Sequence, residues 1–410
     1  MDLAKKMDGF FLPALSQALR AAGEAAAARG WTAYLVGGAV RDMLLGQPCQ
    51  DVDIAIEGEA ITVALDIPGS LKVVRHPRFG TATVRGERWS LDLATSRRES
   101  YPHPGSLPVV SSALIGEDLF RRDFTINAMA VALSPGRRGE LVDPYHGRGD
   151  LTQGLLRVLH DNSFVDDPTR ILRGLRYQAR FGFCMEGHTL EFLRHDKNHL
   201  KGISGHRLRQ EMERILKEEA PERTLSLAIK QGVLHHIALP LEDGAWISQA
   251  FAEARALGRT SPSIYLCLLA YHLMPEQAVA LAERLSLPRT QAQAVADTAR
   301  LRLNLPEASL PPSLLTAYLE GFSRTAVAAH SVVTEPRLSE RLSLFMRRWR
   351  YVKPSLGGND LMTLGVPPGP LMGELLRRLR AARLDGEVRG RRQEEEMVRR
   401  WLGEIRPSET

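Results

Sequence analysis

Two aspartates, Asp51 and Asp53, stand one residue apart in the stretch DVDIAIEG, where their spacing is suited to chemistry. The stretch reads as a β-strand, in which alternate side chains point to the same face of the sheet. Two carboxylates side by side repel each other unless a cation lies between them. Such oxygen ligands suit Mg²⁺, which commonly binds one or two carboxylates plus substrate phosphates. The pair therefore predicts a magnesium site, and the alternative is a solvated strand end with ordinary surface acids.

A third acid, Asp92, lies in another strand-like run, SLDLATS. Three acids on neighbouring strands would hold two metal ions for phosphoryl transfer. One ion would activate an attacking hydroxyl and the other would steady a leaving pyrophosphate. We therefore expect Asp51, Asp53 and Asp92 to be catalytic, with Asp51 and Asp53 as the metal ligands.

The turn before these acids has the composition of a phosphate-binding turn. A strand-like run, TAYLVGG, ends at Gly37 and Gly38, and a short helical run, AVRDMLLG, follows. Glycines there let the backbone approach a ligand, and the helix N-terminus offers free N–H groups to an anion. Arg41, about one turn further on, adds positive charge. We expect Gly38 and Arg41 to hold a triphosphate, the alternative being a structural glycine turn.

The elements that must position these residues begin as a small α/β block. Residues 12–29 have apolar residues at helical spacing, and alternating runs with the hairpin signal VRGERW follow. Strand signals nearly vanish after residue 152, where successive helices begin. We expect an α+β head with a mixed β-sheet and then an all-α remainder, divided into a head at 1–151, a neck at 152–220, a body at 221–335 and a tail at 336–410.

Composition excludes several classes of protein. The 410 residues are 44% hydrophobic, which is ordinary for a globular chain, and no run of about 18 apolar residues predicts a membrane span. Cys49, Cys184 and Cys267 are scattered and form no CxxC pair, which suits a reducing cytoplasm better than a disulfide frame or zinc site. The formal charge of +6 is compatible with a nucleic-acid partner. No pattern indicates an oligomeric state.

The glycine turn and the acid pair belong to the first of five motifs, GGAVRDMLLGQPCQDVDIAI. This motif resembles the nucleotidyltransferase motif of the class II tRNA CCA-adding enzymes and the bacterial poly(A) polymerases. The remaining motifs follow in the family's order over the first half of the chain: RRDFTINAMA at 121–130, DPYHGRGDL at 143–151, DDPTRILRGLRYQARFGF at 166–183 and HRLRQEMERIL at 206–216.

This resemblance implies a template-independent enzyme that adds C and A nucleotides from CTP and ATP to the 3′ end of tRNA. The implied partners are ATP, CTP and the 3′ end and acceptor region of tRNA, and the implied cofactor is Mg²⁺. Enzymes that add only A or only CC, and poly(A) polymerases, are alternatives within the family. A non-catalytic RNA-binding protein and a nucleotidyltransferase acting on small molecules are alternatives outside it.

The fourth motif carries a stripe of polar residues on one side of a predicted helix. Asp167, Arg170, Arg173 and Arg176 recur every three residues. Cytosine and adenine each present an amine donor beside a ring-nitrogen acceptor, which an aspartate and an arginine can match. In the family, the pair corresponding to Asp167 and Arg170 selects the base. Arg173 and Arg176 would face phosphates or hold the aspartate, and a basic RNA-binding or solvated helix face is the alternative.

In the second motif, Arg122 resembles a nucleotide-binding arginine of the family. Asp123 and Asn127 lie four residues apart, so both would face the sugar and the metal site if this stretch is helical. The alternative for Asp123 is a helix cap. In CCA-adding relatives, the loop corresponding to 97–112 is flexible and helps the switch from C to A addition. Its presence favours an enzyme that adds A, although a plain surface connection is an equal alternative.

The predicted tail has three basic segments, at 347–353, 377–384 and 389–392. They are candidates for contacts with the tRNA backbone, because such contacts depend on Lys and Arg. Charged helix faces are often simply solvated, and both interpretations stay open.

Overall fold

The computed structural model describes residues 2–49, 51–242 and 244–405. Within these residues, seven strands form one mixed sheet in the order β3-β4-β5-β2-β1-β8-β9. β2 and β5 are parallel, and the other neighbours are antiparallel. The strands of this sheet are β1 (Ala33–Val36), β2 (Asp53–Ile56), β3 (Lys72–His76), β4 (Thr81–Arg85), β5 (Ser90–Thr95), β8 (Ala130–Ala132) and β9 (Leu141–Val142).

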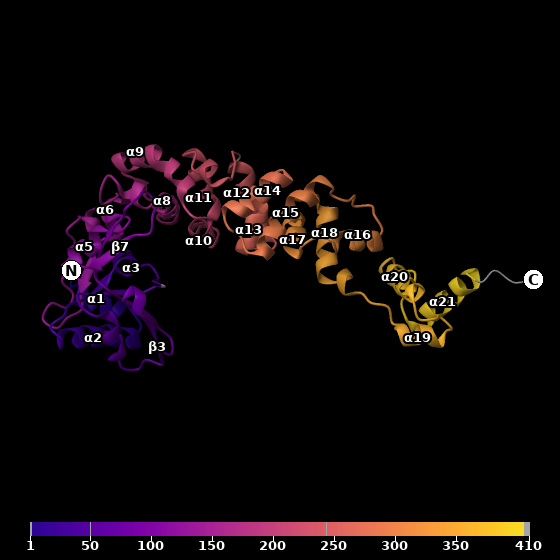
Figure 1. Ribbon diagram of the computed structural model, residues 1–410, viewed down its shortest axis with the longest axis horizontal. Helices are drawn as coiled ribbons and strands as arrows, with labels where there is room; N and C mark the ends of the chain where they lie inside the picture. The colour runs from indigo at the N-terminus through magenta and orange to yellow at the C-terminus, as the bar shows by residue number, and fades with distance from the viewer. Residues whose placement is uncertain (1, 50, 243, 406–410) are drawn as a thin grey trace, which may run out of the picture. The chain divides into compact units, whose positions relative to one another are not determined.

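One face of the sheet is covered along β1 to β5. Its inward side chains, among them Leu35, Ile54, Val84 and Leu93, are at most 1% exposed. Helices of the first part of the chain pack there, with α2 against β1 and α4 against β3, β4 and β5. Figure 1 labels α1, α2 and α3 in this indigo part of the chain. The helices of this region are α1 (Leu3–Phe10), α2 (Pro13–Ala27), α3 (Gly38–Leu45) and α4 (Ala60–Leu65).

The opposite face is covered only in part. At β1 and β8, Tyr34, Val36 and Ala130 pack with Ile115 and Leu119 of α5 (Ile115–Phe120). Further along the same face, on β2, β5 and β4, polar residues replace apolar ones. Period-two alternation along these strands therefore buries one set of side chains and leaves the other set to line an open surface.

The second motif departs from the expected helix. Thr125–Asn127 forms the 3₁₀ turn η2, and the chain then enters strand β8. The register of β8 with β1 buries Ala130, Val131 and Ala132 completely, so sheet pairing overrides the helical propensity of the alanines and methionine.

Two further pairs of short strands lie outside the main sheet, and helices predominate after residue 152 as predicted. Two short strands, β10 (Leu155–Leu156) and β11 (Cys184–Met185), pair in parallel. A separate hairpin is formed by β6 (Arg97–Ser100) and β7 (Val109–Ser112). The helices here are α6 (Gly147–Gln153), α7 (Ser163–Asp166), α8 (Thr169–Phe181), α9 (Gly187–Asp196), α10 (Gly205–Leu216) and α11 (Pro221–Lys230).

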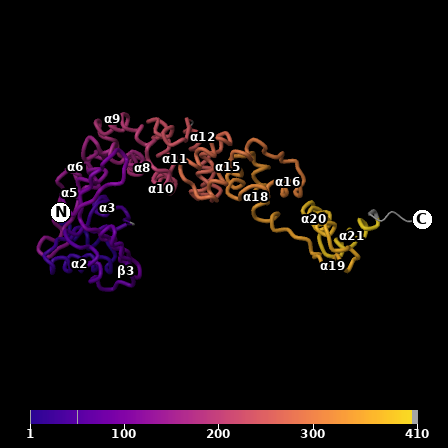
Figure 2. The backbone as a smooth tube through the Cα atoms, viewed as in Figure 1, coloured from indigo at the N-terminus to yellow at the C-terminus, as the bar shows by residue number. Residues whose placement is uncertain are grey.

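The remainder of the described chain is helical, as the tube in Figure 2 shows. One apolar core forms around Leu301, Leu319 and Phe345, and another forms around Leu361, Leu379 and Val398. The helices are α12 (Gly244–Ala256), α13 (Pro262–Leu269), α14 (Pro275–Arg284), α15 (Arg289–Leu303), α16 (Pro312–Leu319), α17 (Arg324–Val333), α18 (Pro336–Arg347), α19 (Gly358–Thr363), α20 (Pro370–Leu384) and α21 (Arg391–Ile405).

The predicted fold class, a mixed-sheet head followed by a helical remainder, is confirmed, and the short pair β10–β11 departs from the all-α expectation. The chain divides into two compact units, one of Met1–Glu211 with Ser226–His236 and the other of Met212–Leu225 with Ile237–Thr410. The finer division at residues 151, 220 and 335 stays a prediction. Across the described residues, the helices lack the combination of length and apolarity that crossing a bilayer requires.

Candidate functional site

Two of the three predicted catalytic acids are direct neighbours in the sheet. Asp53 begins β2 and pairs in register with Asp92 on the parallel strand β5. Asp51 lies two residues before Asp53, ahead of β2, and is exposed, so the expected strand contains Asp53 but not Asp51. The hydroxyl of Thr83, on β4, donates a hydrogen bond of 2.6 Å to Asp92. The open face of the sheet therefore presents a row of carboxylates.

The electrostatics of this row fit a divalent cation. Burial raises the pKa of Asp53 above its ordinary value, and the carboxylates of Asp92 and Asp51 add to that rise, whereas Arg122 opposes it. The described residues contain no group of three or more His, Cys, Asp or Glu side chains spaced to hold a metal ion. Mg²⁺, however, is commonly held by one or two carboxylates together with substrate phosphates, and the oxygen donors present fit that arrangement.

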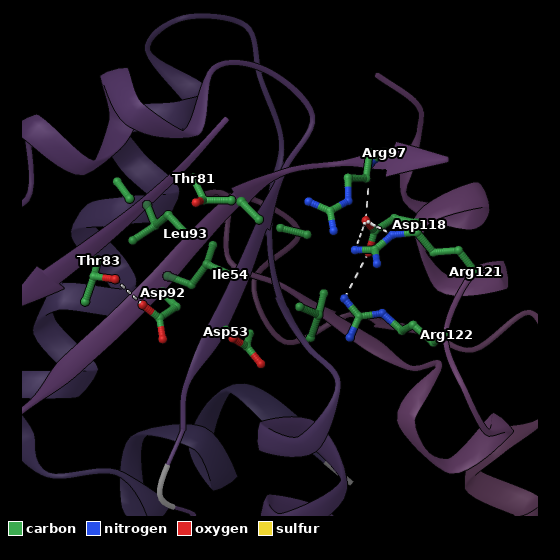
Figure 3. A pocket seen from close by; sticks show the side chains of 14 residues that line it. Asp53, Ile54, Thr81, Thr83, Asp92, Leu93, Arg97, Asp118, Arg121 and Arg122 are labelled. Carbon is green, nitrogen blue, oxygen red and sulfur yellow. Dashed lines mark hydrogen bonds and ion pairs between the residues drawn. The ribbon is translucent and has the colours of Figure 1, made fainter. Parts of the chain in front are cut away.

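A cavity of about 320 Å³ lies over these acids (Figure 3). Asp53 and Asp92 line one side of it, and three arginines with a buried aspartate line the other. The members of that second side are Arg97, Asp118, Arg121 and Arg122. The cavity thus combines carboxylates that can hold a cation with guanidinium groups that can hold an anion.

Asp118 organises the basic side of the cavity. It is 1% exposed and accepts hydrogen bonds from the side chains of Arg121 and Arg122, at 2.8 to 3.0 Å, and from the backbone N–H of Arg97. Burial alone would raise the pKa of Asp118, but Arg122 and Arg121 hold it below its ordinary value. Asp118 was not among the predicted site residues. Its spacing of three and four residues to Arg121 and Arg122 could have predicted these ion pairs on a helix.

The glycine turn and Arg122 fit against each other. Gly37 has φ +68°, and a Cβ on it would lie 2.5 Å from a terminal nitrogen of Arg122. The Nε–H of Arg122 is buried without a hydrogen-bond partner among the described residues. The positive φ favours glycine, and a Cβ at this position would displace the end of the Arg122 side chain. The backbone N–H groups at the Gly37 turn and the guanidinium of Arg122 therefore lie close together as hydrogen-bond donors.

Arg41, predicted to hold phosphate, is only 5% exposed. Its guanidinium donates to Asp42 at 2.8 Å and to Asn127 at 2.5 Å, and it lies over the rings of Tyr177 and Phe181. Gly38 begins α3, and Arg41 lies 3.5 Å from where its Cβ would be. The phosphate role of Arg41 and Gly38 stays a prediction, and the observed contacts tie α3 to α8.

Asp123 and Asn127 belong to the same buried network. One oxygen of Asp123 accepts from the Asn127 amide at 2.9 Å and from the backbone N–H of Phe124, and the other lies 2.6 Å from Arg173. Arg173, Asp123, Asn127 and Arg41 thus form a continuous chain of contacts from α8 to α3. Arg173 holds an aspartate, which was one of its two expected roles, although the aspartate is Asp123. Arg176 is 8% exposed and lies over Tyr177.

The two residues expected to select the base are held by different partners. Asp167 accepts from Thr169 at 2.6 Å and from Arg207 of α10 at 2.6 Å. Arg170 is 4% exposed and donates to the hydroxyl of Ser163 and to the backbone carbonyl of Arg121, both at 2.7 Å. The second contact connects the start of α8 with the arginines at the cavity.

The 97–112 segment is a structured hairpin whose tip packs near Asp167. Gly105, at the tip, donates to the carbonyl of Val165 at 3.1 Å and accepts from Arg207 at 3.0 Å. At the hairpin base, Glu99 accepts from Arg121 at 3.0 Å. Arg207 and Thr83 were also missed by sequence reasoning, since their partners lie far away along the chain or on another strand.

Comparison with known families matches two parts of the chain. Residues 33–157 match the model described as the poly A polymerase head domain. Residues 182–242 match the model described as a probable RNA and SrmB-binding site of polymerase A. The first match contains the carboxylate row and the cavity, and the second includes α10 with Arg207.

Two relatives match most of the length of this chain. An A-adding tRNA nucleotidyltransferase of Halalkalibacterium halodurans is 34% identical over 95% of this chain and 93% of its own length. A second, from Geobacter sulfurreducens, is 32% identical over 87% of this chain, which spans 43% of that longer protein.

The solved structure of a Thermotoga maritima CCA-adding enzyme complexed with tRNA is 28% identical and superposes with a TM-score of 0.77. The match covers 98% of this chain and 99% of that one. With a carboxylate row, an arginine-lined cavity and matches over nearly its whole length, this chain belongs to the family of tRNA nucleotidyltransferases that includes the CCA-adding enzymes and carries the poly A polymerase head domain.

Proposed function

We propose that this protein adds nucleotides from ATP, and from CTP if it builds the whole CCA end, to the 3′ end of tRNA without a template. The observation that carries the proposal is the pairing of Asp53 with Asp92 beside a cavity whose other side is lined by Arg121 and Arg122. Relatives named for A addition and CCA addition support it.

The chemistry is a nucleotidyl transfer. The 3′-hydroxyl of the RNA loses its proton to solvent and its oxygen forms a bond to the α-phosphorus. The bond from that phosphorus to the leaving oxygen breaks, and pyrophosphate departs. Asp51 and Asp53, with Asp92, would hold Mg²⁺, which when bound neutralises charge on the phosphates and lowers the pKa of a bound hydroxyl. Arg122 and the N–H groups at the turn after β1 would hold the triphosphate.

Base selection would come from Asp167 and Arg170. An aspartate accepts from an exocyclic amine and an arginine donates to a ring nitrogen, a pattern that cytosine and adenine share. Asp123, Asn127, Arg173 and Arg176 would position the nucleotide pocket, since several of these side chains are bonded to one another rather than exposed.

Addition of only the terminal A is the activity we favour. The Halalkalibacterium and Geobacter relatives are both named A-adding enzymes. The structured 97–112 hairpin argues against CC-only addition, because CC-only relatives tend to lack this loop. Full CCA addition is the second candidate, because CCA-adding structures cover nearly the whole chain.

The test supplies purified protein with tRNA transcripts that lack the whole CCA end, its last two nucleotides, or only the final A. Each nucleotide is offered alone and in pairs, and the 3′ ends are sequenced. A-only addition predicts that transcripts ending in CC gain one A and that the other transcripts stay unchanged. Completion of all three ends would establish full CCA addition, and long A tracts on unrelated RNA would indicate a poly(A) polymerase.

Asp51→Ala and Asp53→Ala are the matched variants for catalysis. Both should abolish addition while leaving the thermal unfolding midpoint close to that of the unaltered protein. If both variants retained addition, the assignment of Asp51 and Asp53 to metal-assisted catalysis would be wrong. Absence of addition by the unaltered protein would instead favour a non-catalytic RNA-binding role. The predicted cytoplasmic location agrees with three free cysteines at positions 49, 184 and 267.

A further inference from the structure

The β3–β4 edge of the sheet carries two basic side chains, Lys72 and Arg85, on the same face as Asp53 and Asp92. Lys72 of β3 pairs in register with Arg85 of β4, and the next pair on this face is Val74 with Thr83. Thr83 in turn pairs with Asp92. Lys72 and Arg85 are both exposed. They lie two residues along their strands from the level of Thr83 and Asp92, which is about 7 Å at the usual rise per residue.

The positive charges of Lys72 and Arg85 repel each other. Like charges directly opposite each other on neighbouring strands are destabilising. Within the part of the chain that the structure describes, neither Lys72 nor Arg85 has an acidic partner within ion-pair distance. An anion between the two side chains would relieve the repulsion, so the pair has the form of an anion site.

Arginines of the predicted tail contrast with this pair. Arg383 bonds to Glu394, Arg391 bonds to Asp360 and Glu395, and Arg392 bonds to Glu396. Their charge is already compensated within the protein. Lys72 and Arg85 differ from these three arginines because no carboxylate of the described residues pairs with them, so their charge is available to an external phosphate.

The strand order identifies which phosphate this is. The turn at Gly37 follows β1, the acids lie on β2 and β5, and Lys72 and Arg85 lie on β3 and β4. The acids thus stand between the two basic regions. In nucleotidyl transfer the attacking and leaving oxygens lie roughly in line on opposite sides of the phosphorus. If the triphosphate occupies the Gly37 side, the attacking RNA strand must approach from the β3–β4 side.

We propose that Lys72 and Arg85 bind a backbone phosphate of the substrate RNA next to its 3′-terminal nucleotide and guide the 3′-hydroxyl toward the carboxylates. The proposal rests on the proposed function, because it takes the attacking group to be an RNA 3′ end. The partner is single-stranded RNA backbone rather than a free nucleotide.

The test compares Lys72→Gln, Arg85→Gln and the double variant with Arg75→Gln. Arg75 is exposed and lies on β3, the strand of Lys72. Its register partner is Ala82 of the covered face, so its side chain points to the face of the sheet opposite Lys72 and Arg85. Direct binding is measured by fluorescence anisotropy with a labelled tRNA transcript ending in CC, over a range of salt concentrations. Addition kinetics are measured with the same RNA.

The double variant should bind this RNA about tenfold more weakly, and the slope of log affinity against log salt should shrink by about 0.7 to 1, as expected for the loss of one phosphate contact. Its KM for ATP should not rise, because the triphosphate is proposed to bind on the Gly37 side of the acids. Its thermal unfolding midpoint should not fall, because removing like charges relieves repulsion. Arg75→Gln should resemble the unaltered protein.

Equal effects of Arg75→Gln and the double variant, or a double variant that raises only the KM for ATP, would overturn the proposal. The binding measurement needs no catalysis. If the unaltered protein binds the RNA through Lys72 and Arg85 but adds no nucleotide, the proposed function fails while the RNA site stands.

Discussion

The guanidinium of Arg170 donates to the backbone carbonyl of Arg121 at 2.7 Å, which bonds the start of α8 directly to the cavity wall. Arg121 in turn contacts Asp118 and Glu99, so one residue connects the helix predicted to read the base, the cavity, and the 97–112 hairpin. A change at any of the three sites can therefore reach Arg170 through hydrogen bonds.

Ser163→Ala should disturb Arg170 without touching the nucleotide. Ser163 is fully buried, and its hydroxyl accepts from Arg170 at 2.7 Å. Loss of a hydrogen bond to a charged group should lower the free energy of unfolding by about 1.5 to 3 kcal/mol. Urea denaturation measures this, and the ratio of kcat/KM for ATP over GTP should fall. Ser111→Ala, which removes an exposed contact with Arg98, is the control and should cost less than about 0.5 kcal/mol.

Gly37→Ala should weaken nucleotide binding as well as folding. The new Cβ would meet Arg122, and φ at +68° is strained for alanine. We expect a loss of about 1 to 3 kcal/mol in unfolding free energy and an increase of about tenfold in the KM for ATP. Gly46→Ala is the matched control, because Gly46 also has a positive φ, +69°, but a Cβ there meets nothing within 4 Å. A normal KM for ATP in Gly37→Ala would contradict the assignment of Arg122.

Thr83→Val should slow the chemical step. Its hydroxyl orients Asp92, which lies opposite Asp53, whereas valine keeps the volume and loses the donor. We expect kcat to fall about tenfold, corresponding to about 1.4 kcal/mol of barrier, with the KM for ATP little changed. Thr83→Ser keeps the hydroxyl and should restore most of kcat. Equal kcat values for the valine and serine variants would show that the hydrogen bond is not used.

His330 should make stability depend on pH. Burial lowers the pKa of His330 to about 4, below its ordinary value of 6.5, and Arg302 acts in the same direction. The unfolded chain therefore takes up a proton below pH 6.5 while the folded protein stays neutral. The stability that the neutral histidine contributes above pH 6.5 is lost as pH falls toward 4, by up to about 3 kcal/mol.

The measurement follows urea unfolding of the unaltered protein and His330→Gln between pH 7.5 and pH 4.5. The glutamine variant should lose less stability on acidification. Parallel pH dependences for the two proteins would mean that His330 becomes protonated without penalty in the folded state.

Local patterns along the chain determined a large part of this protein. The strand that begins at Asp53, the glycines ending a strand, and the change from strands to helices all follow from interactions over a few residues. The order of the five motifs is also a property of the sequence alone, and it indicates the family without the tertiary structure. These features were predictable because backbone periodicity and turn chemistry depend on near neighbours.

Tertiary structure decided which of these residues meet. That Asp92 stands opposite Asp53, that Arg122 fills the space beside Gly37, and that Arg207 rather than Arg170 bonds to Asp167 depend on strand order and helix packing. Lys72 and Arg85 likewise become a pair only through their register across β3 and β4. Such contacts join residues distant in sequence, and they are fixed by the burial of the whole core rather than by local propensity, so one sequence alone does not reveal them.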